Sequence, residues 1–155
     1  MSVKVIGLTK QFGQQTAVNQ LSFDAHPAEI LGFLGPNGAG KTTTMKMLCC
    51  YTSPTNGTAT ICDYDINDSP LAVRKNIGYL PEHNPLYEDM YVKEYLQFVA
   101  SIHKLDNKTQ RIAEVIDLTG LGDEQNKIIG TLSKGYRQRV GLAQAIIHDP
   151  AVLIL

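Results

Sequence analysis

The feature that most constrains this fold is a glycine-rich stretch of eight residues, Gly35–Thr42 (GPNGAGKT). It fits the phosphate-binding pattern GxxxxGK[ST]. An apolar run, Glu29–Gly35 (EILGFLG), precedes it, and residues at helical spacing follow it from Lys41 to Cys50. A glycine-rich loop between a buried strand and a helix is typical of an α/β fold with a parallel sheet. We therefore predict an α/β P-loop core in which Glu29–Gly35 is a buried parallel strand.

The residue types in this loop suit phosphate binding, because glycines allow successive backbone N–H groups to converge on an anion. The helix that begins at Lys41 adds the positive end of its dipole. Lys41 is expected to contact the β- and γ-phosphates of ATP, the Thr42 hydroxyl to bind Mg²⁺, and Thr43 to contact the α-phosphate. The predicted nucleotide site comprises Gly35, Pro36, Asn37, Gly38, Ala39, Gly40, Lys41, Thr42 and Thr43. The alternative is a glycine-rich turn that fits the pattern without binding a nucleotide.

Periodicity and turn residues predict the remaining elements. Strands are expected at Val3–Leu8, Ala17–Ala25, Thr58–Tyr64 and Ile77–Leu80, and a short helix at Leu71–Lys75. Three later stripes have helical spacing: Val92, Tyr95, Leu96, Val99 and Ile102; Ile112, Val115, Ile116 and Thr119; Leu132, Tyr136, Val140, Ala143 and Ile147. We predict an α/β core over residues 1–85, a helical subdomain over residues 86–148, and a return to the core over residues 149–155.

Composition excludes several classes of protein. The net charge of −1 and the pI of about 6.4 argue against a nucleic-acid-binding surface, which usually needs a pI above about 9. The cysteines Cys49, Cys50 and Cys62 form no CxxC pair and are expected to be reduced, mostly buried thiols. The four histidines are scattered, so no metal is assigned to them. Without a signal peptide or a membrane-spanning apolar run, a cytosolic location is expected.

A second motif narrows the choice of family. Leu132–Arg139 (LSKGYRQR), followed by VGLAQAI, resembles the ABC signature, usually LSGGQxQR. The stretches GPNGAGKTT, SPTNGTATICDYDI and LSKGYRQRVGLAQAIIHDPAVLIL look like an ABC transporter ATP-binding domain. IGYLPEHNPLY and LSKGYRQR are similar to the drug-export and gliding-motility-associated subgroup. The resemblance implies a RecA-like core with an N-terminal antiparallel β region and a helical subdomain.

The resemblance also implies how two subunits would share ATP. Ser133 stands at an N-cap position, ahead of first-turn N–H groups that are available to an anion. In the family this helix end faces away from the P-loop of its own subunit, so Ser133 and Gly135 are expected to meet the γ-phosphate held by a second subunit. The chain would form a homodimer or pair with another ABC ATPase. The alternative for this motif is a plain N-capped amphipathic helix.

Further positions carry over from the family. Phe12 stands where the family stacks an aromatic ring on adenine, but it could also pack on the core. Glu82 stands where most members have a glutamine that touches Mg²⁺ and the membrane subunit. A carboxylate can still bind Mg²⁺, and the alternative is an exposed loop acid. Lys134 replaces a signature glycine and is interpreted as a solvated side chain, while Tyr136 replaces the signature glutamine.

The last five residues, Ala151–Leu155, are apolar and predict the start of a buried parallel strand. We expect the chain to be a fragment cut within this strand, which in the family is the Walker B strand. The Mg²⁺-orienting aspartate, the glutamate that polarises water and the switch histidine would then follow residue 155. No catalytic residue is therefore assigned, and the fragment alone is expected to bind nucleotide weakly without hydrolysing it.

The resemblance implies an ATP-hydrolysing subunit of an ABC transporter, and it favours export. ATP would drive head-to-tail dimerisation, and a transmembrane permease would hold the subunit at the inner face of the cell membrane. Two alternatives stay open. One is a soluble ABC ATPase outside transport, although Tyr87–Gly130 is too short for a long coiled coil and holds no block of like charge. The other is a module in which ATP regulates assembly without being hydrolysed.

Overall fold

The structure is a computed structural model that describes residues 2–155. Contacts divide the chain into two compact units, Met1–Ile77 and Gly78–Leu155, and each unit is described by itself. Both contain strands and helices, as expected for an α/β fold. The finer division at residues 85 and 148 stays a prediction.

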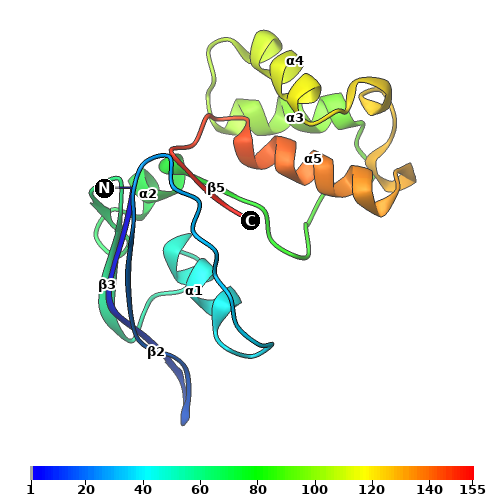
Figure 1. The fold of residues 1–155 in the computed structure, drawn as a ribbon. Coiled ribbons are helices and arrows are strands. Elements are labelled where there is room, and N and C mark those ends of the chain that lie inside the picture. Colours follow the sequence, from blue (N-terminus) through cyan, green and yellow to red (C-terminus); the bar gives the residue numbers. More distant parts are fainter. Residues whose placement is uncertain (1) are drawn as a thin grey trace. The chain divides into compact units, whose positions relative to one another are not determined.

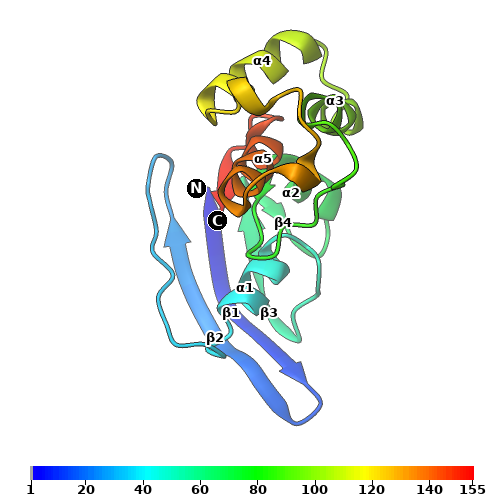
Figure 2. The ribbon, with the colours of Figure 1, turned by 90° about the vertical axis from the view of Figure 1, so that its right-hand side faces the viewer.

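A four-stranded antiparallel sheet, in the order β2-β1-β3-β4, forms the first unit (Figures 1 and 2). Its strands are β1 (Val3–Phe12), β2 (Gln15–Ala25), β3 (Asn56–Ile61) and β4 (Tyr64–Asp65). The two predicted N-terminal strands are confirmed, and both are longer than predicted. The predicted strand Thr58–Tyr64 is instead a hairpin, because Cys62 and Asp63 have positive φ angles of 49° and 67° that turn the chain from β3 into β4.

Two helices accompany this sheet. α1 (Lys41–Leu48) lies over one face of the sheet (Figure 2). α2 (Pro70–Asn76) begins with a proline, whose fixed φ suits the first helical turn. Thr44, Met47 and Leu48 form the buried side of α1. Both helices were predicted, and α1 ends slightly earlier than predicted because Cys50 adopts a left-handed conformation with φ of 57°.

The predicted buried strand Glu29–Gly35 is wrong for this structure. The segment has no regular secondary structure, and Ile30 and Leu34 are 99% and 94% exposed. A parallel strand is held by hydrogen bonds to neighbouring strands, and within residues 2–155 no strand pairs with this segment. The apolar run is therefore present, but its burial depends on partners that the described residues do not supply.

Three helices form most of the second unit: α3 (Val92–Ile102), α4 (Lys108–Leu118) and α5 (Lys134–Ile146). They pack against one another in pairs (Figure 1). β5 (Ile77–Tyr79), which begins at the boundary between the units, and β6 (Val152–Ile154) form a two-stranded sheet. The short 3₁₀ turns Gly122–Glu124 and Ile129–Thr131 connect α4 to α5. The core consists of Val92, Tyr95, Leu96, Val99, Ala100, Ile112, Val115, Ile116, Leu121, Ile129, Leu132, Val140, Ala143 and Ile147.

The three predicted helical stripes supply most of this core. Ile102 is the clearest exception, since it is 61% exposed. Ile102 lies near the end of α3 and outside its buried face, which consists of Val92, Tyr95, Leu96, Val99 and Ala100. β6 confirms a strand within the last five residues. Only Ile154 of the strand is buried, because within the described residues β6 pairs with β5 alone.

The cysteines are free thiols, as predicted: Cys49 is buried, and Cys50 and Cys62 are half-buried. Burial raises the pKa of Cys49 to about 12, and the adjacent Cys50 adds to the shift, so Cys49 stays protonated at neutral pH. Among residues 2–155, no helix combines the length and the apolar character needed to cross a membrane.

The contrast between Leu96 and Ile102 on α3 gives a test of the helical core. Leu96→Ala should lower the free energy of unfolding by about 2–5 kcal/mol, because it leaves a cavity at a fully buried site. Ile102→Ala removes an exposed side chain and should change stability by less than about 0.5 kcal/mol. Urea unfolding followed by circular dichroism measures both. Equal losses in the two variants would contradict the assignment of the buried face.

Candidate nucleotide-binding site

The loop from Gly35 to Gly40 is largely open to solvent and leads directly into α1. The Ala39 N–H donates to the Pro36 carbonyl oxygen at 3.2 Å, which closes a tight turn. Gly38 and Gly40 both have φ of 85°, in the left-handed region that favours glycine. The path of the loop therefore depends on two glycines, one of which, Gly40, is fixed by the sequence pattern.

Gly40 is also required by packing. A Cβ at this position would overlap the carbonyl oxygen of Ala17 in β2, and it would lie 3.0 Å from a methyl group of Val18. Only a residue without a side chain allows the loop to approach the strand so closely. This contact fixes the start of α1 against the sheet.

Lys41 folds back over the loop that precedes it. Its Nζ donates to the carbonyl oxygens of Gly35 and Pro36, at 2.5 Å and 2.8 Å. A flexible lysine side chain is thereby held beside the loop rather than extended into solvent. An anion that enters the loop would meet this ammonium group at once.

The first turn of α1 is suited to an anion. Gly40 provides no side-chain cap, and the first turn contains no acidic residue, so the N–H groups and the helix dipole are not offset by a carboxylate. Thr44 is buried, and its hydroxyl donates to the Gly40 carbonyl oxygen at 3.0 Å. Thr42, by contrast, is exposed, and its hydroxyl has no hydrogen-bond partner among residues 2–155. Thr42 is thus available to a ligand, whereas Thr44 holds the helix.

Phe12 lies at the end of β1, where it pairs with Gln15 of β2 across the hairpin turn. Its ring is 54% exposed, and the Lys10 ammonium lies 5.1 Å from the ring centroid. The ring therefore does not pack into the core, which was the alternative interpretation. An exposed aromatic face of this kind is able to stack on a flat heterocycle.

The segment that resembles the ABC signature begins α5. The Ser133 hydroxyl oxygen accepts a hydrogen bond from the Tyr136 N–H at 3.3 Å, so Ser133 is the N-cap, as predicted. Ser133, Lys134 and Gly135 are all exposed. The first turn of α5 contains no acidic residue. As in α1, the helix presents a terminus without negative charge to solvent.

The two arginines of the same segment hold the helix in place. Arg137 donates to the Leu132 carbonyl oxygen at 2.7 Å. Arg139 donates to the carbonyl oxygens of Thr119 and Gly120, both at 3.3 Å, and its guanidinium lies 5.3 Å from the Tyr136 ring. Both arginines thus bond to backbone carbonyl groups of the same unit, and Lys134 is exposed at the start of α5.

Glu82 lies in the loop that follows β5, and its side chain is exposed. Its backbone carbonyl oxygen accepts a hydrogen bond from Gln138 of α5 at 3.5 Å. Nearby, the Asn84 amide donates to the Arg137 carbonyl oxygen at 3.4 Å. The structure thus places the Glu82 loop along the signature helix, with its carboxylate open to solvent.

The candidate residues fall into the two units. Gly35–Thr43 and Phe12 belong to the first unit, and Glu82, Ser133 and Gly135 belong to the second. Within each unit the structure brings the predicted residues onto exposed loops and helix ends. Among residues 2–155, no three His, Cys, Asp or Glu side chains are grouped so that they could hold a metal ion.

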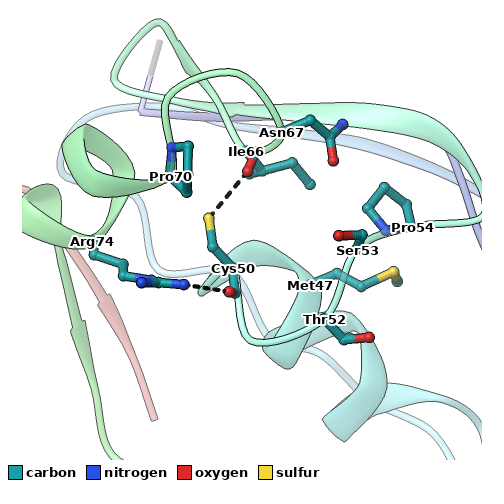
Figure 3. Close-up of a pocket in the computed structure, with 9 residues that line it drawn as sticks. All are labelled: Met47, Cys50, Thr52, Ser53, Pro54, Ile66, Asn67, Pro70 and Arg74. Atoms are coloured by element: carbon teal, nitrogen blue, oxygen red, sulfur yellow. Dashed lines mark hydrogen bonds between the residues drawn. The ribbon is translucent and has the colours of Figure 1, made fainter.

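A pocket of about 310 Å³ lies in the first unit at the C-terminal end of α1, opposite the P-loop end (Figure 3). The Arg74 guanidinium donates to the Cys50 carbonyl oxygen at 2.7 Å, and the Cys50 thiol contacts the Ile66 carbonyl oxygen at 3.4 Å. The first contact satisfies a carbonyl group just after α1 ends, and the second joins this turn to the residue that follows β4. The pocket is lined by Met47, Cys50, Thr52, Ser53, Pro54, Ile66, Asn67, Pro70 and Arg74, and no sequence motif predicted it.

Comparison with known proteins decides the family. The model of the family described as "ABC transporter" matches residues 18–155, which include both the P-loop and the signature segment. The chain belongs to the ABC transporter family. The glycine-rich loop, the start of α5 and the strand β6 all lie within the residues that the family model matches.

Several named ABC proteins are similar to this chain. An uncharacterized ABC transporter ATP-binding protein of Bacillus subtilis, YxlF, is 38% identical over 155 residues, which is 99% of this chain and 51% of the relative. The bacitracin transport ATP-binding protein BcrA of Bacillus licheniformis is 37% identical, with 99% and 50% covered. The probable multidrug ABC transporter ATP-binding protein YbhF of Escherichia coli is 35% identical, with 96% and 26% covered. The chain thus spans about half of the length of these relatives, or less.

Solved ABC structures have the same fold. An ATP-binding subunit of an ABC transporter superposes with a TM-score of 0.89 at 26% identity, covering 99% of this chain and 65% of the solved chain. The dimeric cassette MJ0796 superposes with a TM-score of 0.87 at 22% identity, covering 97% and 72%. The P-loop ABC fold predicted from the sequence is confirmed.

The contact between Gly40 and Ala17 predicts the effect of adding one methyl group in this ABC domain. Gly40→Ala should lower the free energy of unfolding by about 2 kcal/mol or more, because it combines a strained φ with overlap against a strand carbonyl. Gly32→Ala is the matched control, since its added Cβ has no neighbour within 4 Å and its φ is not positive. Thermal or urea unfolding compares the two. A Gly40→Ala variant as stable as Gly32→Ala would show that the loop does not depend on this contact.

Proposed function

We propose that this chain binds Mg²⁺-ATP through Gly35–Thr43, as part of a subunit that hydrolyses ATP to power an ABC transporter. The observation that carries the proposal is the position of Lys41, whose ammonium group lies over the loop carbonyls of Gly35 and Pro36 at the start of α1. A buried or salt-bridged lysine would not serve a phosphate. This one is held next to an open loop and to the uncapped first turn of a helix.

The residues present fit a nucleotide with its metal. Backbone N–H groups of the loop and of the first turn of α1 would hold the β-phosphate, and Lys41 would exchange its bonds to Gly35 and Pro36 for bonds to phosphate oxygens. The free Thr42 hydroxyl would bind Mg²⁺, and Thr43 would contact the α-phosphate. When bound, Mg²⁺ supplies positive charge that neutralises the phosphates. All of these groups come from one continuous stretch, so the site needs no long-range assembly to hold the phosphates.

Two more side chains complete the proposed site. The exposed Phe12 ring would stack on adenine. Glu82, with its carboxylate open to solvent, would approach Mg²⁺ in place of the glutamine found in most of the family. Both roles rest on the family resemblance together with the exposure of these side chains.

The start of α5 would contribute the second half of each site from a partner subunit. Ser133 caps its own helix, and with Gly135 and the unpaired N–H groups it would contact the γ-phosphate held by the P-loop of another copy or of a paired ABC ATPase. The solved cassette MJ0796, which shares this fold, is described as dimeric. ATP would then join two subunits, and hydrolysis would release them. This cycle supplies the two states that a membrane partner needs.

The membrane partner would be a transmembrane permease that holds the subunit at the cytoplasmic face of the membrane. Relatives named for bacitracin transport and for multidrug transport favour export of a small molecule, as in the drug-export and gliding-motility-associated subgroup. The cargo itself would be chosen by the permease.

Replacing Lys41 tests the nucleotide site. Lys41→Ala in the intact subunit should lower the ATP hydrolysis rate by about a hundredfold or more and weaken ATP binding, because it removes the cation that meets the β- and γ-phosphates. Lys46→Ala removes an exposed lysine of the same helix and should leave turnover within about twofold. Release of inorganic phosphate and equilibrium binding of a fluorescent ATP analogue measure the two effects. Undiminished turnover in Lys41→Ala would refute the assignment.

Replacing Ser133 tests the shared site. Ser133→Phe should leave ATP binding to the monomer unchanged, but it should prevent ATP-driven dimerisation because the ring would fill the space reserved for the γ-phosphate of the partner. Ser101→Phe, at another exposed serine of the same unit, controls for the added bulk. Sedimentation with and without ATP, in a hydrolysis-deficient background, separates monomer from dimer. A Ser133→Phe protein that still dimerised with ATP would contradict the head-to-tail arrangement.

A further inference from the structure

Two histidines that are distant in sequence lie face to face in the second unit. The ring centroids of His103 and His148 are 4.0 Å apart, and the ring planes differ by 6°. His103 is the C-cap of α3, and His148 follows Ile147, the C-cap of α5. Both are half-buried. The stack therefore joins the C-terminal ends of two helices through two groups that titrate near neutral pH.

A third side chain holds the same end of α5. Arg111 of α4 donates through Nε to the Ile147 carbonyl oxygen at 2.9 Å and through Nη2 to the Ile146 carbonyl oxygen at 2.7 Å. Its Nη2 also lies 3.7 Å from the Asp149 carboxylate. A permanent cation thus satisfies the last carbonyls of α5, immediately beside His148.

The other charges around the stack come from each neighbouring element. On α4, Glu114 pairs with Arg111 at 3.3 Å. After α3, the exposed Lys104 follows His103 directly, and after α5 the exposed Asp149 follows His148. Sequence neighbours of the two histidines and the ion pairs of Arg111 thus bring two carboxylates and two cations to this part of the unit. Since Arg111 already engages both carboxylates, these acids offer little compensation for a further positive charge.

We propose that the His103–His148 stack is a pH-sensitive clamp on the C-terminal end of α5. The clamp is closed while at most one of the two rings is an imidazolium cation, and it opens when both rings are. One imidazolium is tolerated, because a cation at a helix C-terminus is favoured by the dipole. Two imidazoliums 4.0 Å apart repel each other, and Arg111 adds a third positive charge nearby. Separation of the rings relieves this repulsion, and it frees the turn that leads into β6.

The direction of the pH dependence follows from His103. Burial, and then the nearby His148, hold the pKa of His103 below its ordinary value of 6.5. An unfolded chain therefore binds more protons than the folded chain between these two pKa values. The contribution of His103 to folding stability is therefore complete above about pH 6.5. It is lost as the pH falls from that value through the lower pKa of the folded chain.

The clamp also bears on the proposed function. α5 begins at the signature residues Ser133 to Gly135 and ends at the histidine stack. Opening the stack at acid pH would loosen the C-terminal end of α5. The N-terminus of the same helix presents Ser133 to a partner's ATP. We expect ATP-driven dimerisation to weaken between pH 7.5 and pH 5.5. Only this step rests on the proposed function.

A histidine titration by NMR tests the clamp directly. In the wild-type chain, the two stacked rings should titrate in two coupled steps separated by at least about one pH unit. In His148→Gln, the remaining His103 should titrate in one step at a higher pH than the lower step of the pair. The variant His83→Gln identifies the signal of that exposed histidine and should leave the coupled steps unchanged. Titration of the two stacked rings as independent steps with one common midpoint would overturn the proposal.

Urea unfolding supplies a second readout. The wild-type midpoint should fall from pH 7.5 to pH 5.5 more than the midpoint of His103→Phe, which keeps a ring in the stack but cannot bind a proton. His103→Gln removes both the ring and the titratable group. A loss of stability in this variant that is the same at pH 7.5 and pH 5.5 would come from lost packing of the ring alone. An equal pH dependence in wild type, His103→Phe and His103→Gln would refute the clamp.

Measuring the ATP-driven dimer on the same samples separates the two proposals. Coupled titration with a dimer that weakens at pH 5.5 in wild type, but not in His103→Phe, would support both. These dimer measurements use the intact subunit: coupled titration without any ATP-driven dimer at pH 7.5 would refute the proposed function and leave the clamp standing. Independent titration would refute the clamp whatever the dimer does.

Discussion

The close approach of Gly40 to the carbonyl oxygen of Ala17 is the contact on which the nucleotide site depends. It sets where the P-loop ends and where α1 begins, because only a glycine fits between the loop and β2. Once α1 starts there, its uncapped first turn points at the loop, and Lys41 reaches back over the carbonyls of Gly35 and Pro36. The antiparallel sheet thus acts as the platform that gives a short flexible loop a defined shape.

α5 plays the corresponding role in the second unit. At its N-terminus Ser133 provides the cap, so the signature residues are both structural and exposed. At its C-terminus, Arg111 satisfies the last carbonyls, and His148, just beyond the helix, stacks on His103. One helix thus carries the proposed contact to a partner's nucleotide at one end and a titratable pair at the other. Under the proposed clamp, pH would act on the proposed dimer through this helix.

Local sequence patterns predicted most of the elements and located a candidate phosphate site, whose role stays a prediction. The glycines and Lys41 of the P-loop, the N-cap Ser133 and the helical stripes depend on residues close in sequence, so their spacing alone is informative. The prediction failed where long-range partners decide. Glu29–Gly35 has the composition of a buried strand, yet within residues 2–155 no strand pairs with it. Ile102 has the spacing of a core residue, but in the packed structure it lies on an exposed side of α3.

The sequence by itself determined the family and the positions of the P-loop and the signature helix. Each of these motifs is a short run of consecutive residues, so it can be identified without knowing the tertiary structure. Only the tertiary structure decided which side chains are exposed and which residues meet across the fold. It placed Arg111 on the end of α5, His103 against His148, and Arg74 on the end of α1. None of these pairs has a local signal, because each joins segments at least 24 residues apart through contacts that exist only after the helices have packed.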